Sequence, residues 1–186
     1  MGEKGIQMAP VLKTDSLMIR PFERKDLAAF TRYRAQPDVA RYQSWTEYTY
    51  RDAVTLFERM DYTTFGTTGN WYQLAIADEK TDVLLGDLAV HFIDDAQVEI
   101  GFTVDPQYQR KNIAFHAVNR LLDYLFDTLN RNRVIAVTDA DNRASSRLLE
   151  KLAFRREGHF RQNIFFKGAW GDEYLYAMLN ADFHCR

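Results

Sequence analysis

The chain has 186 residues, of which 46% are hydrophobic and 27% are charged, as in an ordinary folded globular protein. We expect a single domain over residues 1–186, with residues 1–15 as a flexible N-terminal segment. The formal net charge of -2 excludes the basic surface that nucleic-acid binding requires, so no nucleic-acid partner is expected.

The N-terminal half is predicted to hold one strand and two helices. Residues 17–22, LMIRPF, read as the strand, and residues 26–36 and 50–62 read as the helices, the first of them ended by Pro37. The segment between the helices is crowded with aromatic residues, namely Tyr42, Trp45, Tyr48 and Tyr50. Such residues more often pack against a neighbouring face than bind a ligand, and we expect packing, with ligand contact as the minority alternative.

Three consecutive strands follow over residues 71–77, 83–92 and 97–104, joined by Asp-containing turns as an antiparallel meander. Apolar residues at helical spacing then predict a long helix over residues 114–129, and the next strand, 133–138, is parallel to its neighbour because a helical crossover precedes it. A helix over residues 142–151 and strands at 154–166 and 174–179 end the chain, with residues 167–172 as the hairpin connection. The predicted fold class is α/β, with about seven strands and about four helices.

The turn between strand 97–104 and the long helix has the chemistry of an anion site. The first turn of a helix carries unpaired N–H groups and the positive end of the helix dipole. Gln109, Arg110 and Lys111 stand just ahead of that turn, so a phosphate would meet N–H donors and fixed positive charge together. A solvated turn that enters a core helix is an equally good interpretation of this stretch alone.

Metal and membrane sites are not expected. The four histidines, His91, His116, His159 and His184, lack the spacing of a metal site, and the single cysteine, Cys185, stands next to the last residue. No stretch approaches the ~20 apolar residues of a membrane span, and no targeting segment is recognisable, so the predicted location is the cytoplasm, without a membrane partner.

Two segments resemble the GNAT superfamily of acetyl-coenzyme A dependent N-acetyltransferases. The family's loop, Q/R-x-x-G-x-G/A, is matched by the run from Gln109 to Ala114, and NRASSRLLEKLAFRREG from Asn142 to Gly158 is similar to a second family segment. With the opening LMIRPFERKDL and the closing WGDEYLYAML, the chain is similar to the branch that acetylates the N-termini of ribosomal proteins. The resemblance implies a mixed, mainly antiparallel central sheet flanked by helices, with acetyl-CoA as cosubstrate.

Two positions depart from the family pattern. Asn112 stands where the loop has its first glycine, and Asn tolerates a positive φ better than other residues that carry a Cβ. Ala153 replaces a glycine at a helix C-terminus, where glycine is preferred. We expect both substitutions to lower coenzyme affinity without abolishing it.

Glu99 is the candidate general base. Acetyl transfer to an amine requires that the amine lose its proton, and Glu99 is the one ionisable side chain within VEIGFTV, just ahead of the loop. A Glu that faces water through strand alternation is about as good an interpretation from the residues; the resemblance favours the base.

Asn142 and Ser145 are candidates for the coenzyme's sulfur side. They are three residues apart, so they share a face at the beginning of their helix. Ser145 is expected to donate to the departing sulfur and Asn142 to hold the pantetheine arm, while an N-cap is the alternative for Asn142 and Ser146 is the alternative for Ser145. His116 is more simply a local helix residue than an acceptor-site residue.

Positive charge repeats at Arg143, Arg147 and Lys151, and this stripe reaches the coenzyme phosphates or is simply a solvated helix face. The resemblance also implies that the strand near Thr103 and Val104 offers N–H groups to the acetyl group. The residues expected to bind the coenzyme are Thr103, Val104, Gln109, Arg110, Lys111, Asn112, Ile113, Ala114, Asn142, Arg147 and Lys151.

These observations predict an N-acetyltransferase that moves the acetyl group of acetyl-CoA directly to a primary amine, either a small amine or a peptide N-terminus. The alternative is a coenzyme A-binding module that has lost turnover, suggested by Asn112. A nucleotide-binding protein is the weakest hypothesis, because the chain lacks a P-loop GK[ST]. A monomer or a homodimer is expected.

Overall fold

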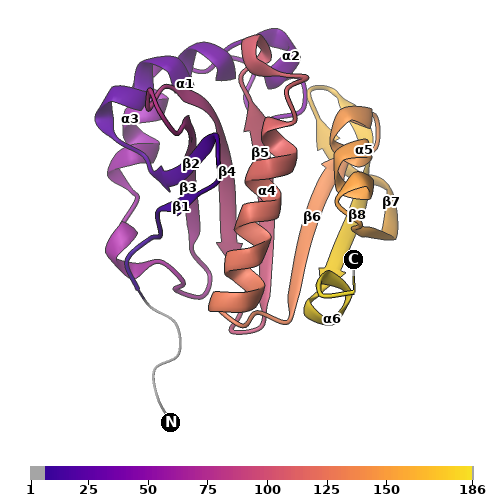
Figure 1. Ribbon diagram of the computed structural model, residues 1–186. Helices are drawn as coiled ribbons and strands as arrows, with labels where there is room; N and C mark the ends of the chain where they lie inside the picture. Colours follow the sequence, from indigo (N-terminus) through magenta and orange to yellow (C-terminus); the bar gives the residue numbers. More distant parts are fainter. Residues whose placement is uncertain (1–6, 186) are drawn as a thin grey trace.

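The computed structural model describes residues 7–185, whose strands form one eight-stranded sheet in the order β1-β2-β3-β4-β5-β6-β8-β7 (Figure 1). The strands are β1 Leu12–Lys13, β2 Leu17–Pro21, β3 Trp71–Asp78, β4 Leu84–Phe92, β5 Gln97–Val104, β6 Arg133–Asp139, β7 Arg155–Phe166 and β8 Ala169–Leu179. Among these eight described strands, only β5 and β6 pair in parallel. The predicted mixed, mainly antiparallel α/β fold is confirmed, with one strand more than expected because residues 12–13 pair with β2.

The beginning of the described chain packs against the sheet. Gln7 forms an isolated bridge with Phe65, and the side chains of Ala9 and Leu12 are buried. These contacts correct the expectation of a flexible segment over residues 1–15, because apolar residues of the segment belong to the main core. Residues 1–6 of that expectation lie outside the described residues.

Helices cover both faces of the sheet. They are α1 Leu27–Arg34, α2 Pro37–Ala40, α3 Tyr50–Glu58, α4 Ile113–Asp123, α5 Arg143–Lys151 and α6 Asn180–Phe183. Two apolar clusters define the faces: α4 and α5 pack with Leu74 and Leu88, whereas α1 and α3 pack with Ala75 and Leu84. Since successive residues of a strand point to opposite faces, Leu74 and Ala75 place these helix pairs on opposite sides of the sheet.

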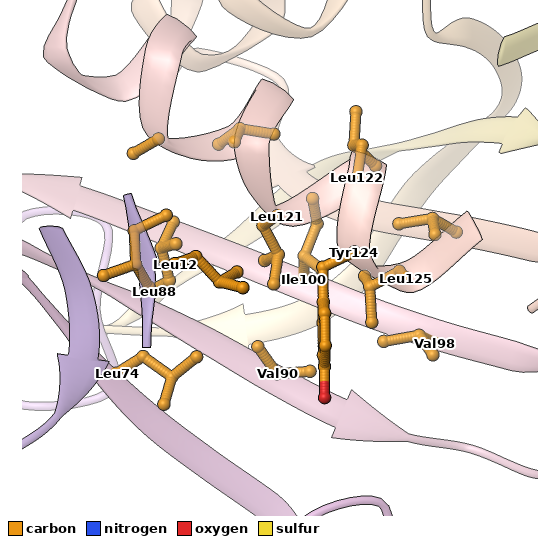
Figure 2. Close-up of a cluster of buried hydrophobic side chains, with 14 of the residues drawn as sticks. Leu12, Leu74, Leu88, Val90, Val98, Ile100, Leu121, Leu122, Tyr124 and Leu125 are labelled. Atoms are coloured by element: carbon orange, nitrogen blue, oxygen red, sulfur yellow. The ribbon is translucent and has the colours of Figure 1, made fainter. Parts of the chain in front are cut away.

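The main core lies under α4 (Figure 2). Leu121 and Leu122 of the helix are fully buried together with Leu88, Val90 and Ile100 of β4 and β5. The helix predicted over residues 114–129 is α4 followed by one π-helical turn, Tyr124–Thr128, which keeps Tyr124 and Leu125 in the same core. Hydrophobic periodicity therefore identified the element and its buried face.

Helices α1 and α3 are shorter than predicted, and the last hairpin has a tighter turn. Pro37 begins α2 as its first residue, because a proline there loses no intrahelical hydrogen bond, and α3 ends at Glu58 rather than near residue 62. The turn between β7 and β8 consists of Lys167 and Gly168, with φ of 50° and 83°. Two successive residues with positive φ suit the twist of a two-residue hairpin, so β8 begins at Ala169 and not at the expected residue 174.

Candidate active site

The candidate site lies where β5 and β6 part. The two strands pair in parallel over three residues, with Gln97 opposite Arg133 at one end and Glu99 opposite Ile135 at the other. Beyond these pairs β5 stays with β4 as far as Val104, and β6 stays with β8 as far as Asp139, so the two strands diverge toward their C-terminal ends (Figure 1). A cavity of about 370 Å³ fills the opening.

The cavity reaches both faces of the sheet, which gives it two chemically different sides. On the α4 and α5 face it is lined by Ile100, Phe102, Asn142, Ser145 and Leu149. On the opposite face it is lined by carboxylates, because the strand registers place Asp87, Glu99, Asp139 and Glu173 on that side. We call these the helix side and the acidic side.

Glu99 occupies the point of divergence. Its side chain is 27% exposed, and its Oε2 atom lies 3.5 Å from Nδ1 of His91 on the neighbouring strand. The position is accessible from the acidic side of the cavity. A carboxylate here is within reach of an amine that enters from that side.

Asn142 and Ser145 are held together at the beginning of α5. Oδ1 of Asn142 accepts a hydrogen bond from the Ser145 backbone N–H at 3.2 Å, which confirms the N-cap interpretation of Asn142. Both side chains line the helix side, as expected. Ser146 points to a second hollow on the far side of α5, which it shares with Tyr176, so the geometry favours Ser145 over Ser146.

The predicted anion loop has the backbone that its sequence requires. Asn112 is the N-cap of α4 with φ of 57° and ψ of 17°, the left-handed conformation for which the family pattern uses glycine. Arg110 also has a positive φ, of 64°. The loop therefore turns sharply into α4, which begins at Ile113 and whose first N–H groups lack intrahelical acceptors.

Three contacts anchor this loop. Nε2 of Gln109 donates to the Val104 carbonyl at 3.1 Å, and Nζ of Lys151 donates to Oδ1 of Asn112, also at 3.1 Å. The buried carboxylate of Asp105, which ends β5, is paired with Arg32 of α1 at 2.6 Å. The sequence interpretation missed Asp105, although an acid directly before Pro106 at a strand end is a recognisable turn signal.

The structure brings some expected residues together and leaves others apart. Glu99, Thr103, Asn142 and Ser145 line one cavity, and Lys151 joins the loop that follows Val104. Arg147 instead lines the second hollow together with Arg143, so only Lys151 of the expected basic stripe contacts the loop. His116 is exposed and is not part of the cavity lining.

A buried network below the acidic side was not anticipated. Asp87 accepts hydrogen bonds from Arg34 at 3.1 Å, from the Tyr33 hydroxyl and from Gln73. Burial, and then the charge of Asp87, raises the pKa of Tyr33 well above its ordinary value, so this hydroxyl stays protonated and donating. The guanidinium of Arg34 lies 4.3 Å from the Phe30 ring centroid and 4.6 Å from that of Trp45.

The aromatic residues after α2 have two roles: some pack against one another, and one lines the cavity. Trp45 and Tyr48 pack against one another at 4.9 Å between ring centroids, as expected for the majority interpretation. Tyr42 lines the cavity.

The sequence held one signal for the buried network around Asp87, because this residue interrupts the apolar run of β4. The partners of Asp87 are remote in sequence, so the network itself could not be predicted.

The hairpin of β7 and β8 closes the acidic side. Ile164 and Phe166 line the cavity, and Nζ of Lys167 in the turn donates to the Ala40 carbonyl at the end of α2. The hairpin thereby meets the α2 segment across the opening. Apolar side chains and carboxylates therefore bound the acidic side of the cavity.

Among residues 7–185, the structure contains no cluster of three or more His, Cys, Asp or Glu side chains arranged to hold a metal ion. In the same part of the chain, no helix has the length and apolar character needed to cross a membrane.

Comparison with known proteins identifies the type of domain. The family described as "Acetyltransferase (GNAT) domain" matches residues 16–155. An uncharacterized N-acetyltransferase of Bacillus subtilis, YnaD, is 31% identical over 174 residues, covering 93% of this chain and 99% of that protein. A crystal structure of a GNAT-family acetyltransferase from Bacillus anthracis superposes with a TM-score of 0.83 at 29% identity, covering 92% of this chain and 99% of that one.

Some of the relatives have names that state the acceptor. Spermidine N(1)-acetyltransferase of Escherichia coli is 26% identical over 155 residues, covering 83% of this chain and 81% of that protein. The alanine N-acetyltransferase of ribosomal protein uS5 from the same organism is 28% identical over 83 residues, 45% of this chain and 43% of that protein. The predicted similarity to ribosomal-protein acetyltransferases is confirmed, as one of several similarities.

Proposed function

Since the chain belongs to the GNAT acetyltransferase family, whose members take an acetyl group from acetyl-coenzyme A, we propose that it acetylates a small primary amine carrying a second positive charge. The observation that carries this proposal is the two-sided cavity between β5 and β6. The helix side offers Asn142 and Ser145, and the acidic side offers Glu99. The two sides meet inside the sheet, so donor and acceptor approach from opposite faces.

The residues on the helix side fit the coenzyme. The left-handed Asn112 exposes the first turn of α4, and Lys151 brings positive charge to the same point. The loop from Gln109 to Ala114 would hold the pyrophosphate, with Asn142 and the strand near Thr103 and Val104 along the pantetheine arm. Acetyl-CoA supplies the acetyl group as a thioester.

The placement of the protein's own groups supports direct transfer. Glu99 takes the proton from the ammonium group of the acceptor, and the neutral nitrogen attacks the acetyl carbonyl. The Ser145 hydroxyl donates to the departing sulfur, whose negative charge grows as the C–S bond breaks. The attacking nitrogen gives up a second proton as the amide forms, and this proton passes to the departing thiolate, so that coenzyme A leaves as the thiol. The proton taken by Glu99 is released to water, and the carboxylate is ready for the next cycle.

The charges on the acidic side indicate the acceptor. Arg34 neutralises Asp87, which leaves Glu99, Asp139 and Glu173 facing the cavity as carboxylates. A cavity with an excess of negative charge favours cations. Asp139 accepts a hydrogen bond from the Asp141 backbone N–H and Glu173 one from the Asn163 amide, and both donors are uncharged. One carboxylate serves the reacting amine, so the charges of Asp139 and Glu173 can attract a second cationic group, as in a diamine or polyamine.

The conformation of Asn112 does not support the alternative function, a coenzyme A-binding module that has lost turnover. The residue adopts the left-handed conformation that the loop requires, so the substitution for glycine does not distort the site. A specific observation in favour of this alternative is lacking within residues 7–185.

The experiment is a thiol-release assay with acetyl-CoA and a panel of acceptors. The panel compares an aliphatic diamine, the monoamine of the same length and a short peptide with a free N-terminus. The proposal expects the diamine to have the highest kcat/KM, and Glu173→Gln to lower kcat/KM for the diamine about tenfold but hardly for the monoamine. Preference for the peptide or the monoamine would overturn the acceptor class, and absence of thiol release with every amine would overturn the acetyltransferase itself.

A further inference from the structure

The imidazole of His91 stands next to the proposed base. Its Nδ1 atom is buried, has no hydrogen-bond partner among residues 7–185, and lies 3.5 Å from Oε2 of Glu99. A buried donor or acceptor without a partner is costly, so a slightly closer approach of the carboxylate is favourable. The two residues are direct neighbours in the β4–β5 register.

Trp71 fixes the plane of this imidazole. The two rings stack with centroids 4.5 Å apart and an interplanar angle of 8°. Trp71 is also part of the cavity lining. The stack restricts His91 to this ring plane, in which the edge that bears Nδ1 is turned to Glu99.

Within residues 7–185, no other charged group of the neighbouring strands competes for this contact. On β5 the facing group is Glu99, on β3 it is the uncharged Trp71, and on β6 the register partner of Glu99 is Ile135. Arg133, two residues earlier on β6, is occupied by Glu157 at 2.6 Å.

We propose that His91 is a positioning residue for Glu99: with its proton on Nδ1, it donates a hydrogen bond to one carboxylate oxygen and leaves the other directed at the acceptor amine. The inference rests on the proposed function, in which Glu99 accepts the amine proton. A base held in one orientation reacts faster than a rotating one, because its alignment does not have to be gained in the transition state. The effect therefore belongs to kcat.

The test replaces His91 in three ways in the full-length chain. Asparagine places an N–H near the position of Nδ1, glutamine places it near the position of Nε2, and phenylalanine keeps a ring for Trp71 but has no donor. His91→Phe should lower kcat about tenfold, with the KM for acetyl-CoA within about twofold, and His91→Asn should recover most of the loss. His91→Gln should resemble His91→Phe. The difference in kcat between the asparagine and glutamine variants decides the question even if the phenylalanine variant folds poorly.

A double-mutant cycle ties the effect to the base. In a Glu99→Gln background, His91→Phe should cause almost no further loss, because the group that it positions no longer accepts a proton. A wild-type kcat in His91→Phe, equal kcat in the asparagine and glutamine variants, or an undiminished tenfold loss in the Glu99→Gln background would each overturn the positioning role. A wild-type rate in Glu99→Gln alone overturns the base role as well, so the two failures are distinguishable.

Discussion

Lys151 at the end of α5 donates a hydrogen bond from Nζ to Oδ1 of Asn112 at the N-cap of α4, at 3.1 Å. The contact joins the two family segments through residues that are 39 positions apart in the chain. It also places an ammonium group beside the helix end that we propose for the pyrophosphate. A phosphate there would compete with Asn112 for Lys151, so the loop can change partners without a change of backbone.

The backbone at Asn112 should control coenzyme affinity. Asn112→Val places a β-branched residue at a φ of 57°, which costs roughly 1–2 kcal/mol, and we expect coenzyme A to bind about tenfold more weakly. Asn112→Gly removes the Cβ and should bind within about twofold of wild type or better. Calorimetric titration measures both, and an unchanged affinity in Asn112→Val would remove the loop from the coenzyme site.

Ala153 offers a stabilising substitution at the other family departure. The end of α5 is a Schellman motif, in which the Phe154 N–H donates to the Leu149 carbonyl and the Ala153 N–H to that of Glu150, both at 2.9 Å. Ala153 has a φ of 67°, so Ala153→Gly should raise the free energy of unfolding by about 1 kcal/mol, or Tm by about 2–4 °C. Ala144→Gly, at the exposed second residue of α5, is the control for an added glycine and should not raise stability. A lower Tm in Ala153→Gly would contradict the strain.

The sequence predicted local features well. Apolar spacing identified α4, and the turn residues identified the sharp turn ahead of it. Asn112 adopts the left-handed conformation that Asn tolerates, and Asn142 is the N-cap of α5, as its side chain suggests. Each of these depends on a few neighbouring residues. The expected hairpin connection was too long, because Lys167 and Gly168 suffice for the turn and the residues from Ala169 onward already pair within β8.

The acidic side could not be predicted because it depends on register and on contacts between remote segments. Arg34 and Asp87 are 53 residues apart, and Glu99 and Glu173 share a face only through the registers of β6 with β5 and β8. The stripe from Arg143 to Lys151 shows the same limit. Helical spacing put the three cations in one row, but the packing of α5 decides that Arg147 faces the second hollow and Lys151 the loop.

The Glu157 carboxylate should make stability depend on acid pH. Hydrogen bonds from Arg133 and then Arg155 lower the pKa of Glu157 from 4.5 to about 2. Since the folded pKa lies below the unfolded one, this stabilisation is complete above about pH 4.5 and is lost as the pH falls toward about 2. Glu157→Gln should lower the free energy of unfolding by about 1 kcal/mol at neutral pH, after allowance for solvent screening, and by nearly nothing at pH 2.

Thermal unfolding of Glu157→Gln and of the wild type, measured over this pH range, compares their free energies of unfolding. Glu47→Gln, which changes an exposed carboxylate in the segment before α3, is the matched control. A difference between Glu157→Gln and wild type that stays constant with pH would show that the side chain acts through packing and not through its charge.

Ser145 should act on the chemical step. Ser145→Ala removes the proposed donor to the departing sulfur, and a hydrogen bond to developing charge strengthens in the transition state, so kcat should fall about tenfold while the KM for acetyl-CoA changes little. Ser146→Ala, on the other side of α5, should leave kcat unchanged. Equal rates in the two variants would reduce Ser145 to a helix residue and assign the sulfur to another donor.

Glu99 is the most direct test of the mechanism. Glu99→Gln keeps the size and the polarity of the side chain but no longer accepts a proton, so kcat/KM for the amine should fall ~10²–10⁴-fold, the usual range for a general base. Coenzyme affinity should stay near the wild-type value, because the loop and Lys151 are separate from Glu99. A pH–rate series separates this role from simple positioning of the amine. If the amine arrives neutral or loses its proton to water, Glu99→Gln will lose less than about threefold over the whole range, and proximity to the thioester will account for the catalysis.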